Sequence, residues 1–209
     1  LASLYGTKVD FFIANFKQLA QVSRAAKEIA QKYPKIHVLV NNAGVFNKRR
    51  RLTADGNEEV FQVIHLSAFL MTKILLSNLM AGSPSRGIDI NSEGHRFGGL
   101  NLKDLTWAKR PYIGLRGYGA AKTAQLLTVQ AYARQLSGSG VTVNAMHPGA
   151  VRTQIGMDNG WLYRTYQTVI LRPFLQKPEV SGEAIYYLLA APEMQGVSGR
   201  FYNKTNEET

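Results

Sequence analysis

A tyrosine and a lysine lie four residues apart in the run Arg116-Gly117-Tyr118-Gly119-Ala120-Ala121-Lys122. Residues at this spacing share one face of a helix. A phenol can donate a proton, and an ammonium group beside it favours the phenolate and lowers its pKa. The pair is therefore a candidate for acid/base chemistry. The spacing alone is common, so the interpretation depends on whether the rest of the chain supplies suitable partners.

Polar or glycine-containing motifs follow three apolar runs that are typical of buried strands. The motifs are Asn41-Asn42-Ala43-Gly44 after 36–40, Ser92 after Ile88-Asp89-Ile90-Asn91, and His147-Pro148-Gly149 after 141–146. In open α/β sheets, ligands bind outside the carboxyl ends of the strands. Small residues there let the backbone approach a ligand closely. For the Asn41–Gly44 segment alone, a plain turn explains the residues equally well.

The elements that would position these motifs alternate along the chain. Hydrophobic spacing predicts helices over about 18–32, 56–80, 118–136 and 179–191. Strands are expected over 9–14, 36–40, 88–91 and 141–146, with a further short run at 197–202. The nearly continuous apolar run 36–40 indicates a strand buried on both faces. Together, 9–14, 18–32 and 36–40 predict a right-handed βαβ unit, and the whole pattern predicts an α/β fold with a parallel sheet.

Composition narrows the function classes. A chain of 209 residues with 45% hydrophobic and 19% charged residues fits one globular domain, 1–209. It has no cysteine, which excludes disulfides and thiolate metal sites and suits a cytoplasmic location. We expect no metal site, and no apolar run is long enough to predict an integral membrane span. The net charge of +11 is mostly scattered and has no groove-reading motif, so we expect no nucleic-acid partner.

The order Asn41-Asn42-Ala43-Gly44, Ser92, Tyr118-x-x-x-Lys122, Pro148-Gly149 resembles the short-chain dehydrogenase/reductase family. The run from Ser92 to Gly98 and the Gly196-Val197-Ser198-Gly199 ending resemble its retinol-dehydrogenase-like branch. The resemblance implies a Rossmann-like, doubly wound parallel sheet with helices on both faces. It also implies an oxidoreductase that uses NAD or NADP to interconvert an alcohol and a carbonyl.

The resemblance also implies a role for each matching residue. Tyr118 would be the general acid/base, Lys122 would lower its pKa and bind the nicotinamide ribose, and Ser92 would hold the substrate oxygen. The implied cofactor-binding residues, besides Tyr118 and Lys122, are Asn15, Asn42, Ala43, Gly44, Pro148, Gly149, Val151 and Thr153. Aromatic residues in 155–175 suggest a lid for a small lipophilic substrate, and a packed surface flap explains them equally well. Association into a homo-oligomer is left open.

Three features depart from the family pattern. Nothing before Val9 matches the family's first strand, glycine-rich turn, helix and second strand, so the N-terminal β-α-β portion is expected to be missing. In the family's strand order those two strands lie between the third and fourth. Ile64 occupies the position of an asparagine that holds a proton-relay water, and Asn15 replaces an aspartate that contacts the adenine. His65 and His95 are expected to be core or loop residues.

These departures leave two interpretations. In the first, the chain is a nicotinamide-dependent oxidoreductase whose active-site half is intact. In the second, it is a truncated, inactive remnant that acts at most as an interaction or scaffold protein. Three explanations for the missing portion are open. Either the sequence is a fragment, the gene product is truncated, or the sheet of this protein closes differently from that of the family. The sequence does not show whether NAD or NADP is used, because the residues that select between the two cofactors follow the missing second strand.

Overall fold

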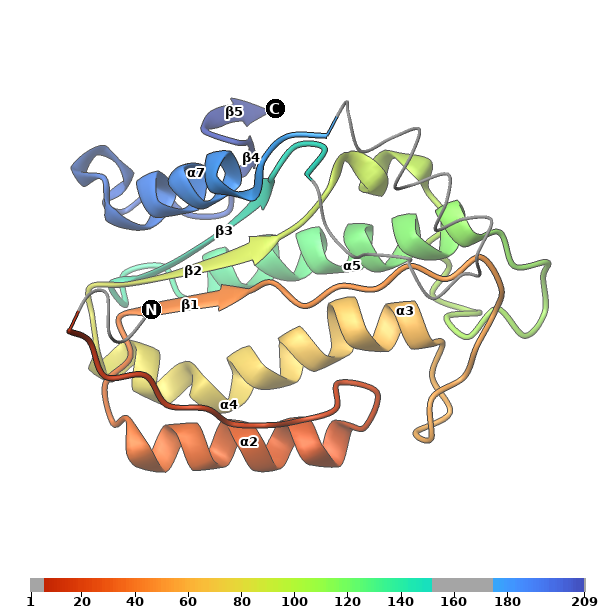
Figure 1. The fold of residues 1–209 in the computed structure, drawn as a ribbon, viewed down its shortest axis with the longest axis horizontal. Coiled ribbons are helices and arrows are strands. Elements are labelled where there is room, and N and C mark those ends of the chain that lie inside the picture. Colours follow the sequence, from red (N-terminus) through yellow and green to blue (C-terminus); the bar gives the residue numbers. More distant parts are fainter. Residues whose placement is uncertain (1–5, 152–174, 209) are drawn as a thin grey trace.

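A computed structural model describes residues 6–151 and 175–208. The described chain is built on a five-stranded sheet of order β1-β2-β3-β4-β5 (Figure 1). The first four strands are parallel, and β5 returns antiparallel to β4. The strands are β1 (Val38–Asn41), β2 (Ser85–Ile90), β3 (Val141–His147), β4 (Phe201–Asn203) and β5 (Asn206–Glu208).

Helices connect these parallel strands, as parallel pairing requires. Between β1 and β2 lie α3 (Glu59–Phe61), the π-helical turn η1 (Gln62–Leu66) and α4 (Ser67–Ala81). The remaining helical elements are α2 (Leu19–Lys32), η2 (Glu93–Phe97), α5 (Gly114–Gln135), α7 (Pro178–Ala190) and η5 (Pro192–Met194). The helices predicted over 18–32, 56–80, 118–136 and 179–191 are therefore confirmed, as are the strands after residue 36.

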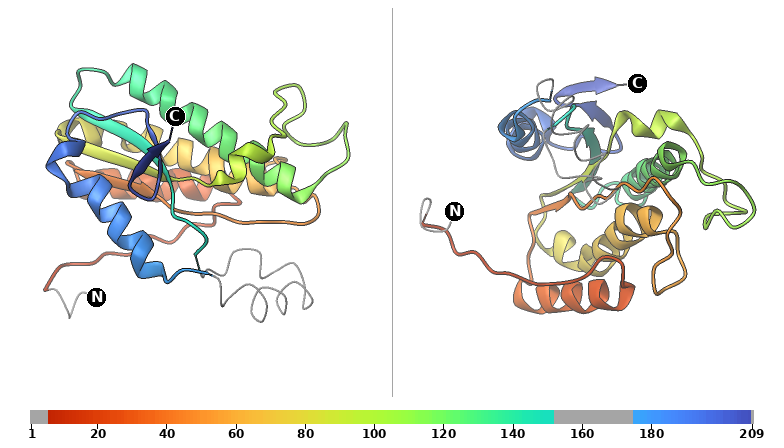
Figure 2. Two further views of the ribbon diagram at one scale, coloured as in Figure 1. Left: turned by 90° about the horizontal axis from the view of Figure 1, so that it is seen from above. Right: turned by 45° about the vertical axis from the view of Figure 1, so that its right-hand side comes forward.

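Two apolar clusters form the core on opposite faces of the sheet. On one face, Leu79 of α4 and Val129 of α5 pack with Val143 of β3. On the other face, Leu188 of α7 packs with Ile88 of β2. The views in Figures 1 and 2 show the same layering, with α4 and α5 on one side of the sheet and α7 on the other. The doubly wound α/β arrangement is thus confirmed.

The predicted first strand is wrong. Residues 9–14 are extended, but the structure assigns them to no strand, so the expected βαβ unit is not formed. The expectation that 36–40 is buried on both faces is also wrong, because Val38 is 46% exposed and Val40 is 37% exposed. Both errors have one physical cause. β1 is the edge of the described sheet, so no described strand covers it or links it to residues 9–14.

One described helical stretch is long and apolar enough to span a bilayer by length and composition, namely Glu59–Ala81. In this fold it is a core helix, since α4 packs against α2 on one side and η1 packs against α5 on the other. Ile64 and Leu75 within it are almost completely buried. Its hydrophobicity is therefore accounted for by packing inside the domain.

Candidate active site

A cavity of about 870 Å³ opens at the carboxyl ends of β1, β2 and β3. Its size lies in the usual range for small-molecule and cofactor sites. It brings together nine of the residues that the sequence predicted. They are Asn42, Ala43, Gly44, Ser92, Tyr118, Lys122, Pro148, Gly149 and Val151. Motifs separated by more than a hundred residues thus meet at one edge of the sheet.

Two predicted cofactor-binding residues are not among those that line this cavity. Asn15 is exposed, and its side-chain oxygen accepts a hydrogen bond from the backbone N–H of Lys17 at 3.0 Å. Its neighbour Lys17 lines the cavity instead. Thr153 lies outside the described residues, as does most of the aromatic segment 155–175. The roles of Asn15, Thr153 and the lid therefore stay predictions.

Ser92 is placed by the end of β2 and by the start of η2. Its hydroxyl oxygen caps η2 by accepting a hydrogen bond from the backbone N–H of Gly94 at 3.0 Å. Such a serine cap fixes the backbone direction at a helix start. The same hydroxyl is also hydrogen-bonded to the phenol of Tyr118, which reaches it from α5. The serine and tyrosine that the sequence proposed are therefore in direct contact.

Tyr118 is held by close packing of α5 on η2. A Cβ added at Gly94 would lie 2.5 Å from Cε1 of the Tyr118 ring, so only glycine leaves room for the ring there. Phe46 packs edge-on against the other side, with ring centroids 6.0 Å apart. Burial raises the pKa of Tyr118, and the hydrogen bond from Ser92 opposes that rise.

Lys122 lies one turn along α5 from Tyr118 and is only 3% exposed. Its Nζ donates to the backbone carbonyl oxygen of Ile90 at 2.6 Å and to Oε1 of Gln125 at 3.2 Å. The ammonium nitrogen is 5.7 Å from the centroid of the Tyr118 ring. Burial lowers the pKa of Lys122 to about 8, although the carboxylate of Asp89 favours its charged form.

The effect of Lys122 on the pKa of Tyr118 that the resemblance implied stays a prediction. Burial has the largest influence on the pKa of Tyr118 and raises it. The ammonium group is directed to the end of β2 and to Gln125 rather than to the phenol oxygen. What the structure provides at this position is a buried cation that is fixed one helical turn below the phenol.

Asp89 has the hydrogen-bond partner that a carboxylate inside a parallel strand requires. Its Oδ1 accepts from Nδ2 of Asn41 at 2.7 Å, and the same amide donates to the hydroxyl of Thr72 at 2.9 Å. Desolvation raises the pKa of Asp89 to about 6, against the opposing effects of Asn41 and Lys122. Asn41, the first residue of the predicted turn motif, thus ties β1 to β2 rather than lining the cavity.

The sequence reasoning missed Asn91, which precedes Ser92. Its Oδ1 accepts from the backbone N–H of Ser92 at 2.8 Å. Its Nδ2 donates to the backbone carbonyl of Lys122 at 2.9 Å and to Oε1 of Gln125 at 3.2 Å. One buried amide therefore links the serine to the helix that carries the lysine. An asparagine at a strand end beside a candidate serine was the available signal.

Other cavity residues were assigned no role from the sequence. Lys17 forms an ion pair with Glu59 at 2.9 Å, and Nδ2 of Asn47 donates to the same carboxylate at 3.1 Å. The Nδ1 atom of His147 is buried and has no hydrogen-bond partner within the described parts of the chain. Ser181 of α7 reaches the strand ends by donating to the carbonyl of Pro148 at 2.8 Å. These contacts depend on tertiary packing alone.

The remaining sequence predictions near the site concern three residues. Ile64 is fully buried in an apolar cluster with Ala121 and Ala124 of α5, so its side chain offers no polar group. His65 packs between Phe61 and Phe69, and burial lowers its pKa to about 4. The His95 ring contacts Phe201, and its Nδ1 is 2.8 Å from the carbonyl oxygen of Ser92. Both histidines have the packing environment expected of them.

No group of metal-ligating side chains is found among the described residues.

Comparison with known proteins places this chain in a family. The sequence model of the short chain dehydrogenase family matches residues 1–160. The chain is 36% identical over 189 residues to human retinol dehydrogenase 13, which covers 88% of this chain and 57% of that protein. It is 36% identical over 192 residues to mouse retinol dehydrogenase 14, which covers 91% of this chain and 57% of that protein. The chain thus spans little more than half the length of these curated relatives.

Solved structures support the same fold. A short chain dehydrogenase from Burkholderia cenocepacia in complex with NADP is similar with a TM-score of 0.66 at 22% identity, covering 92% of this chain and 74% of that chain. NADPH-bound carbonyl reductase from chicken fatty liver gives a TM-score of 0.70 at 18% identity, covering 100% of this chain and 79% of that chain. Together with the family match over most of the sequence, the fold and the gathered motifs lead to one conclusion: this chain belongs to the short-chain dehydrogenase family, in its retinol-dehydrogenase-like part.

Proposed function

We propose that this protein is an oxidoreductase that interconverts an alcohol and a carbonyl with NAD or NADP as hydride carrier. The observation that carries the proposal is the contact between Ser92 and Tyr118 above the buried Lys122, in one cavity at the strand ends. A proton donor, an oxygen-binding hydroxyl and a fixed positive charge are the groups that carbonyl reduction requires from a protein.

In this proposal each side chain handles a proton or holds the substrate. Ser92 donates a hydrogen bond to the carbonyl oxygen and keeps it within reach of the Tyr118 hydroxyl. Tyr118 gives its proton to that oxygen in reduction and takes it back in oxidation. The nearby charge of Lys122 stabilises the phenolate that remains. The cofactor, when bound, supplies or accepts the hydride.

The described residues fit the nicotinamide end of such a cofactor. Lys122 and Tyr118 line the cavity together with Asn42–Gly44, which follow β1, and Pro148–Val151, which follow β3. Gly149 has a φ of +85°, and a Cβ there would approach Oε1 of Gln176 to 3.0 Å, so glycine keeps this loop close to the cavity. We propose these residues, rather than Asn15, as the main cofactor contacts in the described chain.

A lipophilic alcohol or carbonyl is the substrate class that we propose. Apolar side chains from three separate elements line the cavity, including Phe46, Ile90 and Ile185. The two curated relatives named above are called retinol dehydrogenases, which agrees with an apolar substrate for this chain as well.

Calorimetric titration with NAD and with NADP tests the proposal. We expect saturable binding of at least one of them, with a Ser92→Ala control that retains affinity because Ser92 contacts the substrate oxygen rather than the cofactor. Absence of binding of both at millimolar concentration would contradict the proposal. That result would favour the alternative, an inactive remnant with an interaction or scaffold role, for which buried Ile64 is the supporting observation.

A further inference from the structure

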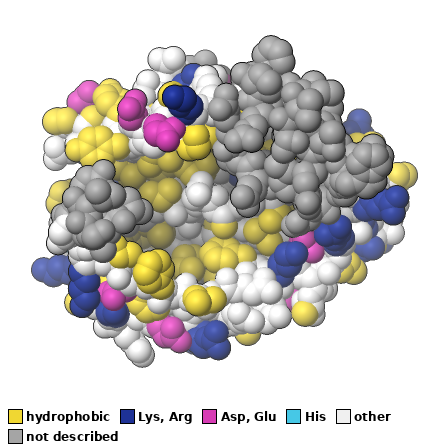
Figure 3. Space-filling view, in the orientation of Figure 1, with side chains coloured by type: hydrophobic (Ala, Val, Ile, Leu, Met, Phe, Trp, Pro, Cys, Tyr) yellow, Lys and Arg dark blue, Asp and Glu magenta, His cyan; other side chains and the backbone are white. Residues whose placement is uncertain are grey.

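Two segments of the chain form a strongly basic surface at one end of the molecule. Residues 45–57 follow β1, and residues 97–116 lead from η2 into α5. Together they hold eight of the 25 lysine and arginine residues but only two of the 14 acidic residues. Figure 1 shows both segments beyond the carboxyl ends of the strands, and Figure 3 shows lysine and arginine side chains gathered at that end. We call residues 45–57 and 97–116 the basic surface.

The two segments of the basic surface are in contact with each other. The Nε atom of Arg50 donates a hydrogen bond to the backbone carbonyl of Thr106 at 2.6 Å. A Cβ added at Gly114 would lie 2.7 Å from the backbone carbonyl oxygen of Asn47, so the start of α5 packs closely on the first segment. The basic residues therefore belong to one continuous surface rather than to two separate loops.

The few acidic residues of this surface do not cancel its charge. Asp104 is buried, and its carboxylate accepts hydrogen bonds from the backbone N–H groups of Ala108 at 2.8 Å and Lys109 at 3.1 Å. The Nε atom of Arg110 lies 3.5 Å from the same carboxylate. Asp55 is therefore the one exposed carboxylate of the surface. Seven exposed basic residues face solvent there, namely Lys48, Arg49, Arg50, Arg51, Lys103, Lys109 and Arg116.

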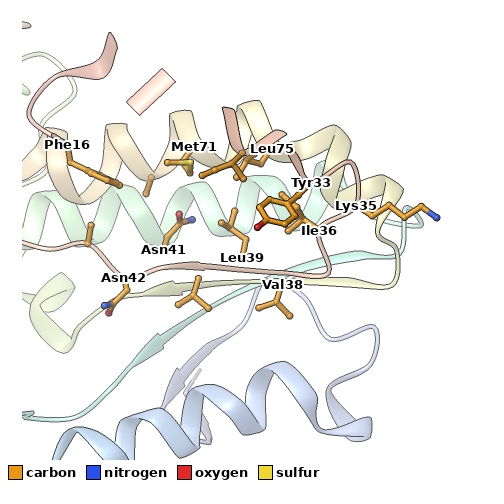
Figure 4. A pocket seen from close by; sticks show the side chains of 14 residues that line it. Phe16, Tyr33, Lys35, Ile36, Val38, Leu39, Asn41, Asn42, Met71 and Leu75 are labelled. Atoms are coloured by element: carbon orange, nitrogen blue, oxygen red, sulfur yellow. The ribbon is translucent and has the colours of Figure 1, made fainter. Parts of the chain in front are cut away.

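Large apolar side chains are exposed among these basic residues. Leu102 is 81% exposed, and four others are about half exposed, namely Leu52, Phe97, Ile113 and Leu115. Three of the five are leucines that each adjoin an exposed lysine or arginine in the sequence. The apolar groove of about 540 Å³ beside β1 is different, because Lys35 is the only charged residue among those that line it (Figure 4). The combination of exposed charge and exposed apolar groups is thus particular to the basic surface.

We propose that the basic surface docks on an anionic lipid bilayer. Its lysine and arginine side chains contact the headgroups, and its exposed apolar side chains enter the outer part of the acyl layer. Each basic residue near an anionic membrane strengthens binding, and buried apolar area adds to it. The apolar stems of lysine and arginine lie along the lipid while their charged ends stay at headgroup level. A peripheral membrane surface needs both kinds of side chain, and this surface provides both.

Nucleic acid is the other polyanion that a basic surface attracts. Surfaces that bind single strands combine basic side chains with exposed aromatic rings, on which the bases stack. In the second segment, Trp107 is only 4% exposed, and the guanidinium carbon of Arg110 lies 3.5 Å from the centroid of its ring. Four of the five exposed apolar side chains are aliphatic and offer no stacking face. These features favour lipid over nucleic acid.

Docking in this way would place lipid beside the candidate active site. Val45, Phe46 and Asn47 line the cavity of about 870 Å³, and they directly precede the basic run 48–51. A lipophilic substrate dissolved in the bilayer would then be close to the cavity. This consequence rests on the proposed function, whereas the docking itself depends only on the basic surface.

Cosedimentation with vesicles tests the proposal without cofactor or substrate. The wild-type chain should bind vesicles of phosphatidylcholine mixed with phosphatidylserine, and it should be released by added salt. Replacement of Arg49, Lys103 and Lys109 by Gln should weaken this binding by about 100-fold. The control replaces three exposed basic residues elsewhere, Lys27, Lys35 and Arg134, by Gln. It lowers the net charge equally and should bind at least tenfold more tightly than the first variant.

A second pair of variants tests the apolar contribution. Leu102→Ser should weaken binding to the mixed vesicles by about tenfold, and Leu127→Ser, at a 53% exposed position on α5, should not. Circular dichroism should be unchanged, since both side chains are exposed. The proposal is overturned if the wild-type chain does not bind the mixed vesicles, or if it binds pure phosphatidylcholine equally well. Equal binding by the two triple variants would also overturn it, because net charge alone would then explain the binding.

A Leu102→Ser protein that binds the vesicles as wild type does would overturn membrane docking as well. The surface would then be a purely electrostatic site for anions, and retention on single-stranded DNA would identify nucleic acid as one such ligand. Because vesicle binding is measured without NAD or NADP, failure of this proposal leaves the calorimetric test of the proposed function unaffected. Failure of cofactor binding likewise leaves the vesicle result unchanged.

Discussion

Lys122 of α5 donates a 2.6 Å hydrogen bond to the backbone carbonyl of Ile90, the last residue of β2. Through this contact the candidate catalytic helix is attached to the strand that delivers Ser92. A buried ammonium group with two hydrogen bonds costs less than an unpaired one, but its removal from water is still unfavourable. The position of the cation is thus maintained at the expense of stability.

The pH dependence of unfolding should reveal this cost. Burial lowers the pKa of Lys122 from 10.5 to about 8, so between these values the unfolded state binds more protons. Stability from this group therefore rises with pH across that interval, by roughly 3 kcal/mol. The difference in unfolding free energy between wild type and Lys122→Met, measured with urea, should change by this amount from pH 8 to 10.5. Equal pH dependence would contradict the burial effect, and exposed Lys27→Met is the matched control.

Asp89 should show the opposite dependence at lower pH. Desolvation raises its pKa from 3.8 to about 6, so the folded state binds more protons between these values. Stability from this group is then present in acid and is lost as pH rises towards 6. Asp89→Asn retains an acceptor for Asn41 but cannot ionise. Because Asp89 is only partly buried, we expect wild type to lose roughly 2 kcal/mol relative to the variant.

Urea unfolding at intervals from pH 4 to 7 measures this difference for Asp89→Asn. The control is Glu28→Gln, which removes an exposed carboxylate from α2. A variant that gains no stability over wild type as pH rises would show that Asn41 and Lys122 compensate fully for the desolvation of Asp89.

Much of the fold could be predicted because its signals are local. Hydrophobic spacing located α2, α4, α5 and α7, and the motifs at strand ends located the cavity. The strand predicted over residues 9–14 was wrong because a strand needs a partner to pair with. These residues have the composition of a strand, but no described strand lies beside them. The links made by Asn91 and Asn41 could not be predicted, since each depends on which strands and helices are adjacent in space.

Asn91 should act as a positioning residue. Asn91→Leu removes the links to Ser92 and Lys122 and leaves their backbone groups without a buried partner. We expect a loss of about 1–3 kcal/mol in unfolding free energy. If turnover is present, kcat should fall more than the affinity for cofactor changes, because Ser92 shifts relative to Tyr118. Retention of full kcat would mean that Ser92 is fixed by its cap on η2 alone.

Gly94 should be required for the position of Tyr118. In Gly94→Ala the new methyl group meets the tyrosine ring at 2.5 Å, so either the ring or η2 must move. The expected loss is about 1–3 kcal/mol of stability. Gly182→Ala on α7 is a matched control, since its methyl group meets nothing within 4 Å and alanine favours the helix. Thermal unfolding measures the stability of the two variants. It compares a glycine whose added methyl group meets a neighbouring ring with one whose methyl group meets nothing.

In the proposed reaction the Tyr118 hydroxyl exchanges a proton with the substrate oxygen. Tyr118→Phe removes that hydroxyl and keeps the ring that packs on Gly94 and Phe46. Single-turnover reduction of a lipophilic aldehyde by NADPH or NADH should therefore fall by about 10²–10⁴-fold, while cofactor affinity measured by calorimetry stays close to wild type. A Tyr118→Phe protein that reduces the aldehyde at the wild-type rate would contradict the account.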